Sequence, residues 1–209
     1  MSNFVSIKAG AGMEELTIET KPGDGPVIGT GAHIWPGGRA AAVYLAGHAR
    51  NVLANRVVLE VGSGTGLLGL VAAQLGAARV VLSDVTEMLP LLEANVARNR
   101  AVTTAEVDVV ALHWGEDDVH EDLPPLDWIL ASDCVYSMEA IEPLLDALVA
   151  HAVPGKTTVL MATEIRDSDV CTTFLQRAAE RGFKARKVAS KKHGFPDMEL
   201  HRMTLSNAT

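Results

Sequence analysis

The chain has 209 residues, of which 48% are hydrophobic and 21% charged, so its composition excludes a disordered chain and fits one globular domain. Its formal net charge of -8 argues against a nucleic-acid partner, whose phosphates carry the same sign. No apolar run reaches the roughly 18 residues that cross a bilayer, and the first residues form no basic and apolar leader. We therefore expect a cytoplasmic protein with no membrane partner.

The chain has two cysteines, Cys134 and Cys171, which are too few and too far apart for a zinc site or a disulfide framework. Both are predicted to be reduced core residues, and the side chain of Cys134 is predicted to point into the core. The seven histidines show no convincing helical i, i+4 pair, so no metal site is expected. His33 either borders a site or is a structural histidine.

Residues 1–34 are predicted to form an N-terminal extension that contains a possible β-hairpin. Residues 13–21 alternate between apolar and polar side chains, as a strand does. Residues 26–35 are interpreted as the partner of this strand or as a loop that crosses the core. Pro36 then stands at a plausible first helical position of a helix over 36–49.

From residue 56 onward, buried strands alternate with amphipathic or buried helices. This order predicts a parallel sheet with helices on both faces. The predicted strands are 56–61, 78–84, 105–112, 126–132 and 156–163, and the predicted helices are 65–76, 86–99, 138–152 and 167–182.

The last two strands, 183–190 and 198–205, have no helix between them. They predict an antiparallel hairpin added to the sheet, a feature that dehydrogenase Rossmann domains normally lack. No repeat or linker interrupts the chain, so residues 1–209 are predicted to be one domain, with the extension 1–34 followed by a core over 35–209.

A glycine-rich turn, "LEVGSGTGLLG", follows the strand 56–61 and opens the next helix. Its glycines let the backbone approach a ligand, and a helix N-terminus offers free N–H groups. Asp84 ends the following strand, 18 residues after Gly66, where a carboxylate can accept hydrogen bonds from ribose hydroxyls. The unit predicts a nucleoside-containing ligand. The alternative is a structural turn with a capping aspartate.

The position of Glu60 helps to distinguish between two nucleoside-containing ligands, a dinucleotide and S-adenosylmethionine. It stands two residues before the first glycine, where a pyrophosphate would gain little from a carboxylate, whereas a cationic sulfonium ligand tolerates it. This pattern favours S-adenosylmethionine over a dinucleotide.

Four stretches, "VVLEVGSGTGLLGLVAAQLGAARVVLSD", "HIWPGG", "LHWG" and "DCVY", together resemble the seven-β-strand protein-lysine methyltransferases of the methyltransferase-like 21 group. The resemblance covers about residues 26–185. It implies an α/β, Rossmann-like class I methyltransferase fold, with a seven-stranded mostly parallel sheet and a C-terminal antiparallel hairpin. It also implies S-adenosyl-L-methionine as cofactor and a protein substrate that bears the target lysine.

The resemblance also assigns site residues. Trp35 would line the methionine end of the cofactor, Asp84 would bind the ribose and Trp114 would lie beside the adenine. Together with the turn and the residue that precedes the Asp-x-x-Tyr signature, the predicted cofactor-binding residues are Trp35, Glu60, Gly62, Ser63, Gly64, Gly66, Asp84, Trp114 and Ser132.

Asp133 and Tyr136, the ends of that signature, are the predicted catalytic residues. Asp133 would orient and recruit the amine, since a carboxylate with an ordinary pKa is a poor general base at pH 7. The Tyr136 ring would form a wall of the lysine channel. The alternative is that Asp133 caps the following helix and that Tyr136 packs on it.

The tryptophans have alternatives too. Trp114 would otherwise anchor a loop, and Trp35 would otherwise pack as a hydrophobic staple at a helix start. Trp128 is expected in the core or as surface cover rather than in contact with a ligand.

The sequence thus predicts an S-adenosylmethionine-dependent N-methyltransferase that acts on a lysine side chain of a protein. Three alternatives stay open. The same fold could methylate a protein histidine or a small-molecule amine. The chain could instead be a nicotinamide-dependent oxidoreductase, or a binding protein without catalysis.

Overall fold

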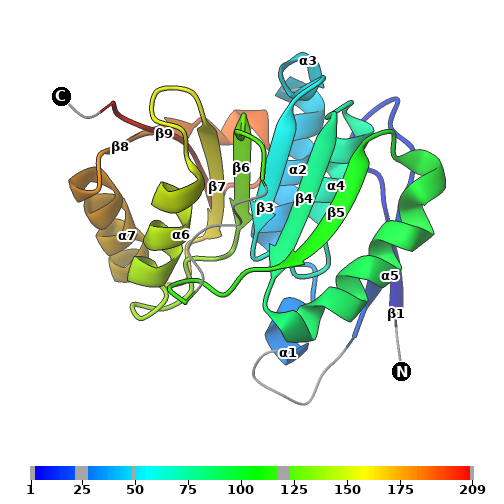
Figure 1. Cartoon of the computed structure of the whole chain (residues 1–209), viewed down its shortest axis with the longest axis horizontal. Coiled ribbons are helices and arrows are strands. Elements are labelled where there is room, and N and C mark those ends of the chain that lie inside the picture. Colours follow the sequence, from blue (N-terminus) through cyan, green and yellow to red (C-terminus); the bar gives the residue numbers. More distant parts are fainter. Residues whose placement is uncertain (1–2, 22–27, 49, 117–122, 208–209) are drawn as a thin grey trace.

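Seven strands form one sheet in the order β5-β4-β3-β6-β7-β9-β8 in the computed structural model, which describes residues 3–21, 28–48, 50–116 and 123–207 (Figure 1). The first five strands of this order are parallel, whereas β9 runs antiparallel to both of its neighbours. The strands are β3 (Val57–Val61), β4 (Arg79–Asp84), β5 (Glu106–Ala111), β6 (Trp128–Ser132), β7 (Thr158–Glu164), β8 (Phe183–Val188) and β9 (Met198–Leu205).

Helices cover both faces of the sheet, as predicted. The longer helices are α2 (Pro36–His48), α4 (Leu67–Gln74), α5 (Leu89–Asn99), α6 (Ile141–His151) and α7 (Ser168–Glu180). Short helical segments are α1 (Ile28–Gly31), α3 (Arg50–Leu53), η1 (Thr86–Met88), η2 (Arg100–Val102) and η3 (Ser190–Lys192). Figure 1 shows α6 and α7 in front of the sheet and α2 and α4 behind it. The predicted fold class is confirmed.

The two faces of the sheet bury separate cores because successive side chains of a strand point to opposite faces. In β3, Val58 packs with α2 and α4, whereas Leu59 and Val61 pack with α6. Helix α4 is apolar around its whole circumference, and residues 67–73 are all buried. A helix of this kind is stable only in the interior, so the glycine turn that precedes it is fixed to the centre of the sheet.

The N-terminal residues form a separate two-stranded sheet of β1 (Asn3–Ile7) and β2 (Leu16–Thr20). A strand is present within the predicted range 13–21, over Leu16–Thr20. Of the two interpretations of residues 26–35, the pairing with this strand is wrong. Residues 28–31 form α1, and the part over 26–27 lies outside the described residues. β1 is the better partner because Val5 and Ile7 lie opposite Ile18 and Leu16, which gives the hairpin an apolar face.

Two asparagines of α5 hold this hairpin in place. The Asn95 side chain exchanges hydrogen bonds with the backbone of Glu19, at 2.7 and 3.1 Å, and the Asn99 side chain does the same with Thr17, at 2.8 and 3.0 Å. The Asn95 amide also donates to the Thr65 carbonyl in the glycine turn, at 2.9 Å. The extension is therefore joined directly to the segment that was predicted to bind the cofactor.

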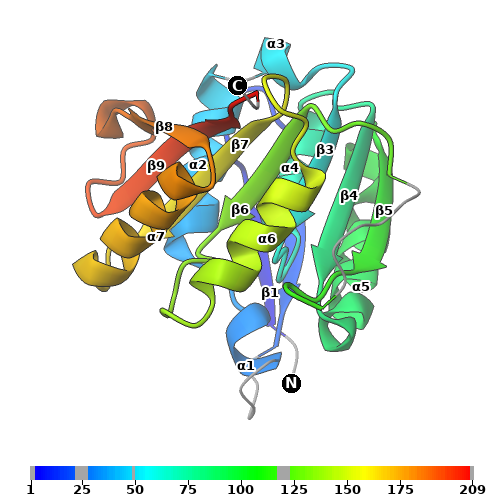
Figure 2. The same ribbon diagram turned by 60° about the vertical axis from the view of Figure 1, so that its left-hand side comes forward.

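The C-terminal hairpin has the predicted antiparallel pairing, and β9 lies between β7 and β8 (Figure 2). Within the described ranges, no helix has the length and apolar character that a membrane span needs.

Candidate active site

A cavity of about 720 Å³ opens at the carboxyl ends of β3, β4 and β6. This is the edge where open parallel sheets bind ligands, and the volume lies in the range typical of small-molecule sites. Ten of the eleven predicted site residues line it, which are Trp35, Glu60, Gly62, Ser63, Gly64, Asp84, Trp114, Ser132, Asp133 and Tyr136.

Gly66 is the predicted residue that does not line the cavity. It has a φ of 79° and immediately precedes α4, where a Cβ would lie 3.0 Å from a methyl of Leu92 and 3.2 Å from one of Leu82. The structure thus gives Gly66 a close packing position beneath the turn.

The glycine turn follows β3 and closes on itself through Ser63. The Ser63 hydroxyl donates to the Glu60 carbonyl and accepts from the Ser83 N–H, at 3.1 and 3.0 Å. Gly64 has a φ of 55°, and a Cβ there would lie 2.7 Å from the carbonyl oxygen of Gly31. Only glycine fits both the left-handed backbone and this close approach. The turn is therefore built to place bare backbone at the cavity.

Asp84 ends β4 beside this turn. Its carboxylate accepts from the Gly64 N–H at 2.7 Å and from the Val85 N–H at 2.8 Å. Burial raises the pKa of Asp84 above its ordinary value, while these two hydrogen bonds act in the opposite direction. Since each carboxylate oxygen has a second lone pair, Asp84 keeps acceptor capacity toward the cavity.

Glu60 is 1% exposed and accepts from the Gly69 N–H in α4, at 3.0 Å. Burial raises the pKa of Glu60 to about 8, against hydrogen bonds from Gly69 and Ser63 that lower it. The carboxyl is then largely uncharged at pH 7. The argument that a full negative charge favours a cationic ligand is therefore weakened, and Glu60 joins β3 to α4.

Trp114 follows β5 and lies against the glycine turn, with its ring 2.9 Å from where a Cβ of Gly62 would be. Its ring is thus close to the turn at the same edge of the sheet as Asp84. Trp128, by contrast, is 4% exposed within β6, and Arg202 lies over its ring at 5.1 Å. The prediction that Trp128 belongs to the core is confirmed.

Trp35 precedes α2 and is half-buried. Its indole N–H donates to the Thr30 carbonyl at 2.8 Å, which fixes the ring beside the cavity. The His33 ring lies 6.1 Å away, and His33 also lines the cavity.

Asp133 follows β6 with a φ of 53°, an uncommon conformation that aspartate tolerates better than most residues. One carboxylate oxygen accepts from the Gly37 N–H at 2.7 Å and the other from the Glu164 N–H at 3.0 Å. Asp133 does not cap the following helix. It caps the start of α2 and joins it to the end of β7, because these two elements converge on the carboxyl end of β6.

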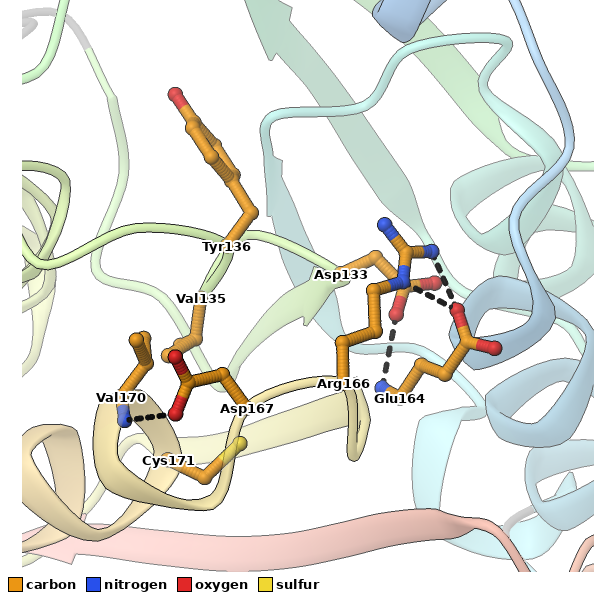
Figure 3. Close-up of a pocket in the computed structure, with 8 residues that line it drawn as sticks. All are labelled: Asp133, Val135, Tyr136, Glu164, Arg166, Asp167, Val170 and Cys171. Carbon is orange, nitrogen blue, oxygen red and sulfur yellow. Dashed lines mark hydrogen bonds and ion pairs between the residues drawn. The ribbon is translucent and has the colours of Figure 1, made fainter.

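The surroundings of Asp133 shift its pKa in opposite directions. Burial raises its pKa, while the two backbone bonds and the nearby Arg166 lower it. Tyr136 is 66% exposed, and Figure 3 shows its ring directed away from the Asp133 carboxylate. Tyr136 is thus mostly open to solvent at the rim of the cavity. Burial of part of the ring still raises the pKa of Tyr136.

Cys134 is buried, and its thiol lies 3.3 Å from the Val61 carbonyl. Its predicted place in the core is confirmed. Cys171 is also a free thiol, but the prediction that it lies in the core is wrong, because it is only partly buried on α7. Among the described residues, no group of three or more His, Cys, Asp or Glu side chains could hold a metal ion.

Three neighbours of the site were missed in the sequence. They are Gly37 at the start of α2, Glu164 at the end of β7, and Arg166 just after β7. Glu164 and Arg166 had a usable signal, because they lie at and just beyond the carboxyl end of the strand that neighbours β6. Parallel pairing therefore brings them to the same sheet edge as Asp133.

Comparisons with known proteins agree with this architecture. The model of a family described as lysine methyltransferase matches residues 13–181. A histone-arginine methyltransferase METTL23 of Xenopus laevis is 41% identical over 156 residues, which are 74% of this chain and 62% of that protein. A protein-lysine methyltransferase METTL21E of Mus musculus is 33% identical over 141 residues, 65% of this chain and 57% of that protein. This chain thus spans less than two thirds of both relatives.

A protein N-lysine methyltransferase METTL21A of Danio rerio is 37% identical over 157 residues, which are 72% of this chain and 69% of that protein. Among solved structures, the Thermus thermophilus 16S rRNA N2 G1207 methyltransferase RsmC matches with a TM-score of 0.64 at 20% identity, over 99% of this chain and 51% of that chain. At this identity the structural match shows the fold alone. The family match covers most of the chain and the Danio rerio relative is well above 30% identical, so this chain belongs to the lysine methyltransferase family.

Proposed function

We propose that this protein is an S-adenosylmethionine-dependent N-methyltransferase that acts on a lysine side chain of another protein. The observation that carries the proposal is one cavity that is lined by the glycine turn, Asp84 and Asp133 together. Family membership supports the reaction class.

The residues present fit the cofactor. Asp84 retains lone pairs for the ribose hydroxyls, and the turn at Gly62 and Gly64 leaves no side chain in the way. The Trp114 ring offers a face for the adenine, while Trp35 and Ser132 would border the methionine end. When bound, the cofactor supplies an electrophilic methyl group on a positively charged sulfur.

The chain's own residues must then prepare the nucleophile. A free lysine amine has a pKa of about 10.4 and is almost fully protonated at pH 7, so the site must bind it where a proton can leave. Asp133 is held by two backbone donors, and its remaining lone pairs can orient the amine. Alignment of the amine would provide most of the rate, without a covalent enzyme intermediate.

Tyr136 would act from the rim. Its exposed ring can attract an ammonium group as the target enters, which is the role predicted from the sequence. Its position away from Asp133 favours guidance of the target over proton transfer at the reacting nitrogen.

A second candidate acceptor is an arginine side chain. This proposal is supported by the relatives named histone-arginine methyltransferases, which reach 41% identity. The histidine and small-molecule alternatives gain no such support, and the family match disfavours a nicotinamide-dependent oxidoreductase. We also propose a cytoplasmic location, which two free thiols favour because that compartment is reducing.

A thermal melt tests cofactor class. At about 100 times the dissociation constant, a ligand adds about 2.7 kcal/mol of stability and raises the melting temperature by several degrees. S-adenosylmethionine or its demethylated product should do so, and NAD should not. Asp84→Ala should abolish the shift. Stabilisation by NAD alone would refute the proposal.

Transfer is tested with labelled S-adenosylmethionine and a cell lysate, followed by mass spectrometry of the labelled protein. Label on a lysine nitrogen supports the main proposal, and label on an arginine supports the second. Cofactor binding without transfer to any protein would favour a non-catalytic binding protein.

A further inference from the structure

Arg166 lies in the segment between β7 and α7, and its charged side chain lines the rim of the cavity. The Cζ atom of Arg166 lies 4.3 Å from the centroid of the Trp35 ring. Its guanidinium also forms an ion pair with the Glu164 carboxylate. Figure 3 shows Arg166 beside both Glu164 and Asp133.

Arg166 marks a boundary between two spaces. Together with Asp133 and Tyr136, it lines both the large cavity and a second hollow of about 20 Å³ that extends toward α7. That hollow also borders the Asp167 carboxylate. Arg166 therefore stands at the edge of the large cavity on the side of Asp133.

The groups around Arg166 form a receptor for a cation. An indole face and a carboxylate on the same cation are the contacts that arginine and lysine side chains make in proteins. A second carboxylate, that of Asp133, lies close enough for the charge of Arg166 to lower its pKa. The chemistry that holds Arg166 is thus the chemistry that would hold a target ammonium or guanidinium group.

Displacement of Arg166 would cost little. Its side chain is 46% exposed and Glu164 is 30% exposed, and ion pairs at such positions contribute little to stability because water competes for both charges. The residue also lies outside the neighbouring strand and helix, so it can turn toward solvent without breaking either.

We propose that the Trp35 ring and the Glu164 carboxylate form the entry site for the cationic end of the target side chain, and that Arg166 occupies this site until the target displaces it. The inference rests on the proposed function for the identity of the target. Arg166 is then an internal competitor that sets the affinity for the substrate.

The kinetic test is Arg166→Met, which keeps a long apolar side chain and removes the charge. The KM for the protein substrate found by the transfer experiment should fall about threefold to tenfold, the size of effect expected for a lost rim contact. Arg202→Met is the matched control. It removes a guanidinium that is stacked on the Trp128 ring, and neither Arg202 nor Trp128 lines either cavity. The KM of this variant for the protein substrate should stay unchanged. A raised or unchanged KM in Arg166→Met would overturn the proposal.

A binding test needs no activity. N-butylguanidinium and n-butylammonium are titrated into the wild type, Arg166→Met and Arg166→Met/Glu164→Gln, with the Trp35 indole resonance followed by NMR. Both cations should bind Arg166→Met at least about threefold tighter than the wild type, and the second substitution should remove the gain. Equal binding to wild type and Arg166→Met would overturn the inference. Failure of the proposed function would instead appear as no stabilisation by S-adenosylmethionine and no transfer.

Discussion

Asp84 and Asp133 each end a strand at the same sheet edge, and each accepts two backbone N–H donors, but the donors come from different parts of the chain. Asp84 binds the adjacent Val85 and Gly64 in the neighbouring turn. Asp133 binds Gly37, 96 positions away, and Glu164, 31 positions away. The first carboxylate shapes one turn, whereas the second joins three elements.

This difference indicates that the hydrogen bonds of Asp84 matter less for the stability of the fold than those of Asp133. Removal of Asp84 leaves the Gly64 N–H at the edge of a wide cavity, where water can replace the lost acceptor. Removal of Asp133 leaves the N–H of buried Gly37 without its partner and frees the start of α2 from β6 and β7. Of the two, Asp133 should therefore matter more for stability.

The largest expected effect is that of Asp133→Ala. It should lower the free energy of unfolding by about 3 kcal/mol, since two charged hydrogen bonds are lost and alanine is strained at a φ of 53°. Asp84→Ala should cost only about 1 kcal/mol. Urea denaturation of both variants measures the difference, and equal losses would remove the distinction between the two sites.

Asp133→Asn is the control for this prediction. Asparagine tolerates the same backbone conformation, but its one carbonyl oxygen can accept from only one of the two backbone N–H groups. It should therefore lose less stability than Asp133→Ala, but not retain that of the wild type.

A smaller effect is expected from a substitution of Gly37, whose N–H donates to the Asp133 carboxylate. In Gly37→Ala, the new Cβ would lie 2.5 Å from a carboxylate oxygen of Asp133, so either α2 or Asp133 must shift. We expect a loss of about 2 kcal/mol in the free energy of unfolding. Gly38→Ala is the matched control, because its Cβ would lie 3.3 Å from the Ser132 hydroxyl and the helix gains propensity. A Gly38→Ala loss as large as that of Gly37→Ala would contradict this account.

The last prediction concerns pH at the other end of the cavity, and it is a change across a pH range rather than the effect of one substitution. The raised pKa of Glu60, about 8 against an ordinary 4.5, means that the folded protein holds a proton that the unfolded chain releases at lower pH. Stability from this group is complete below pH 4.5 and decreases as pH rises toward 8, with a slope of at most about 1.4 kcal/mol per pH unit. Glu60→Gln should show a flatter curve in urea denaturation from pH 5 to pH 8. Parallel curves would show that the buried carboxyl does not keep its proton.

Local patterns were sufficient for much of this molecule. The alternation of strands and helices predicted the sheet, and the glycines with Asp84 predicted the turn, because these features depend on residues close together in the sequence. Glu60 shows a limit of that approach. Its position was correct, but the effect of burial on its charge depends on the packed core around it.

The surroundings of Asp133 could not be predicted in the same way. Gly37 and Glu164 meet it only after α2 packs on the sheet and β7 pairs with β6, and no local spacing encodes those contacts. The pairing of β2 with β1 was missed for a related reason. Two segments, β1 and residues 26–35, were possible partners of β2, and only β1 forms an apolar face with it in the folded hairpin.

The position of β9 between β7 and β8 has a consequence for folding. During synthesis the ribosome releases β7, α7 and β8 before β9, yet β8 joins the sheet only through β9. One edge of β7 therefore stays unpaired until the last strand emerges, and an unpaired edge is open to association with other chains. The half of the sheet that carries Asp133 and Arg166 would be completed last, so nascent chains would be most exposed to aggregation just before the target-binding side of the cavity forms.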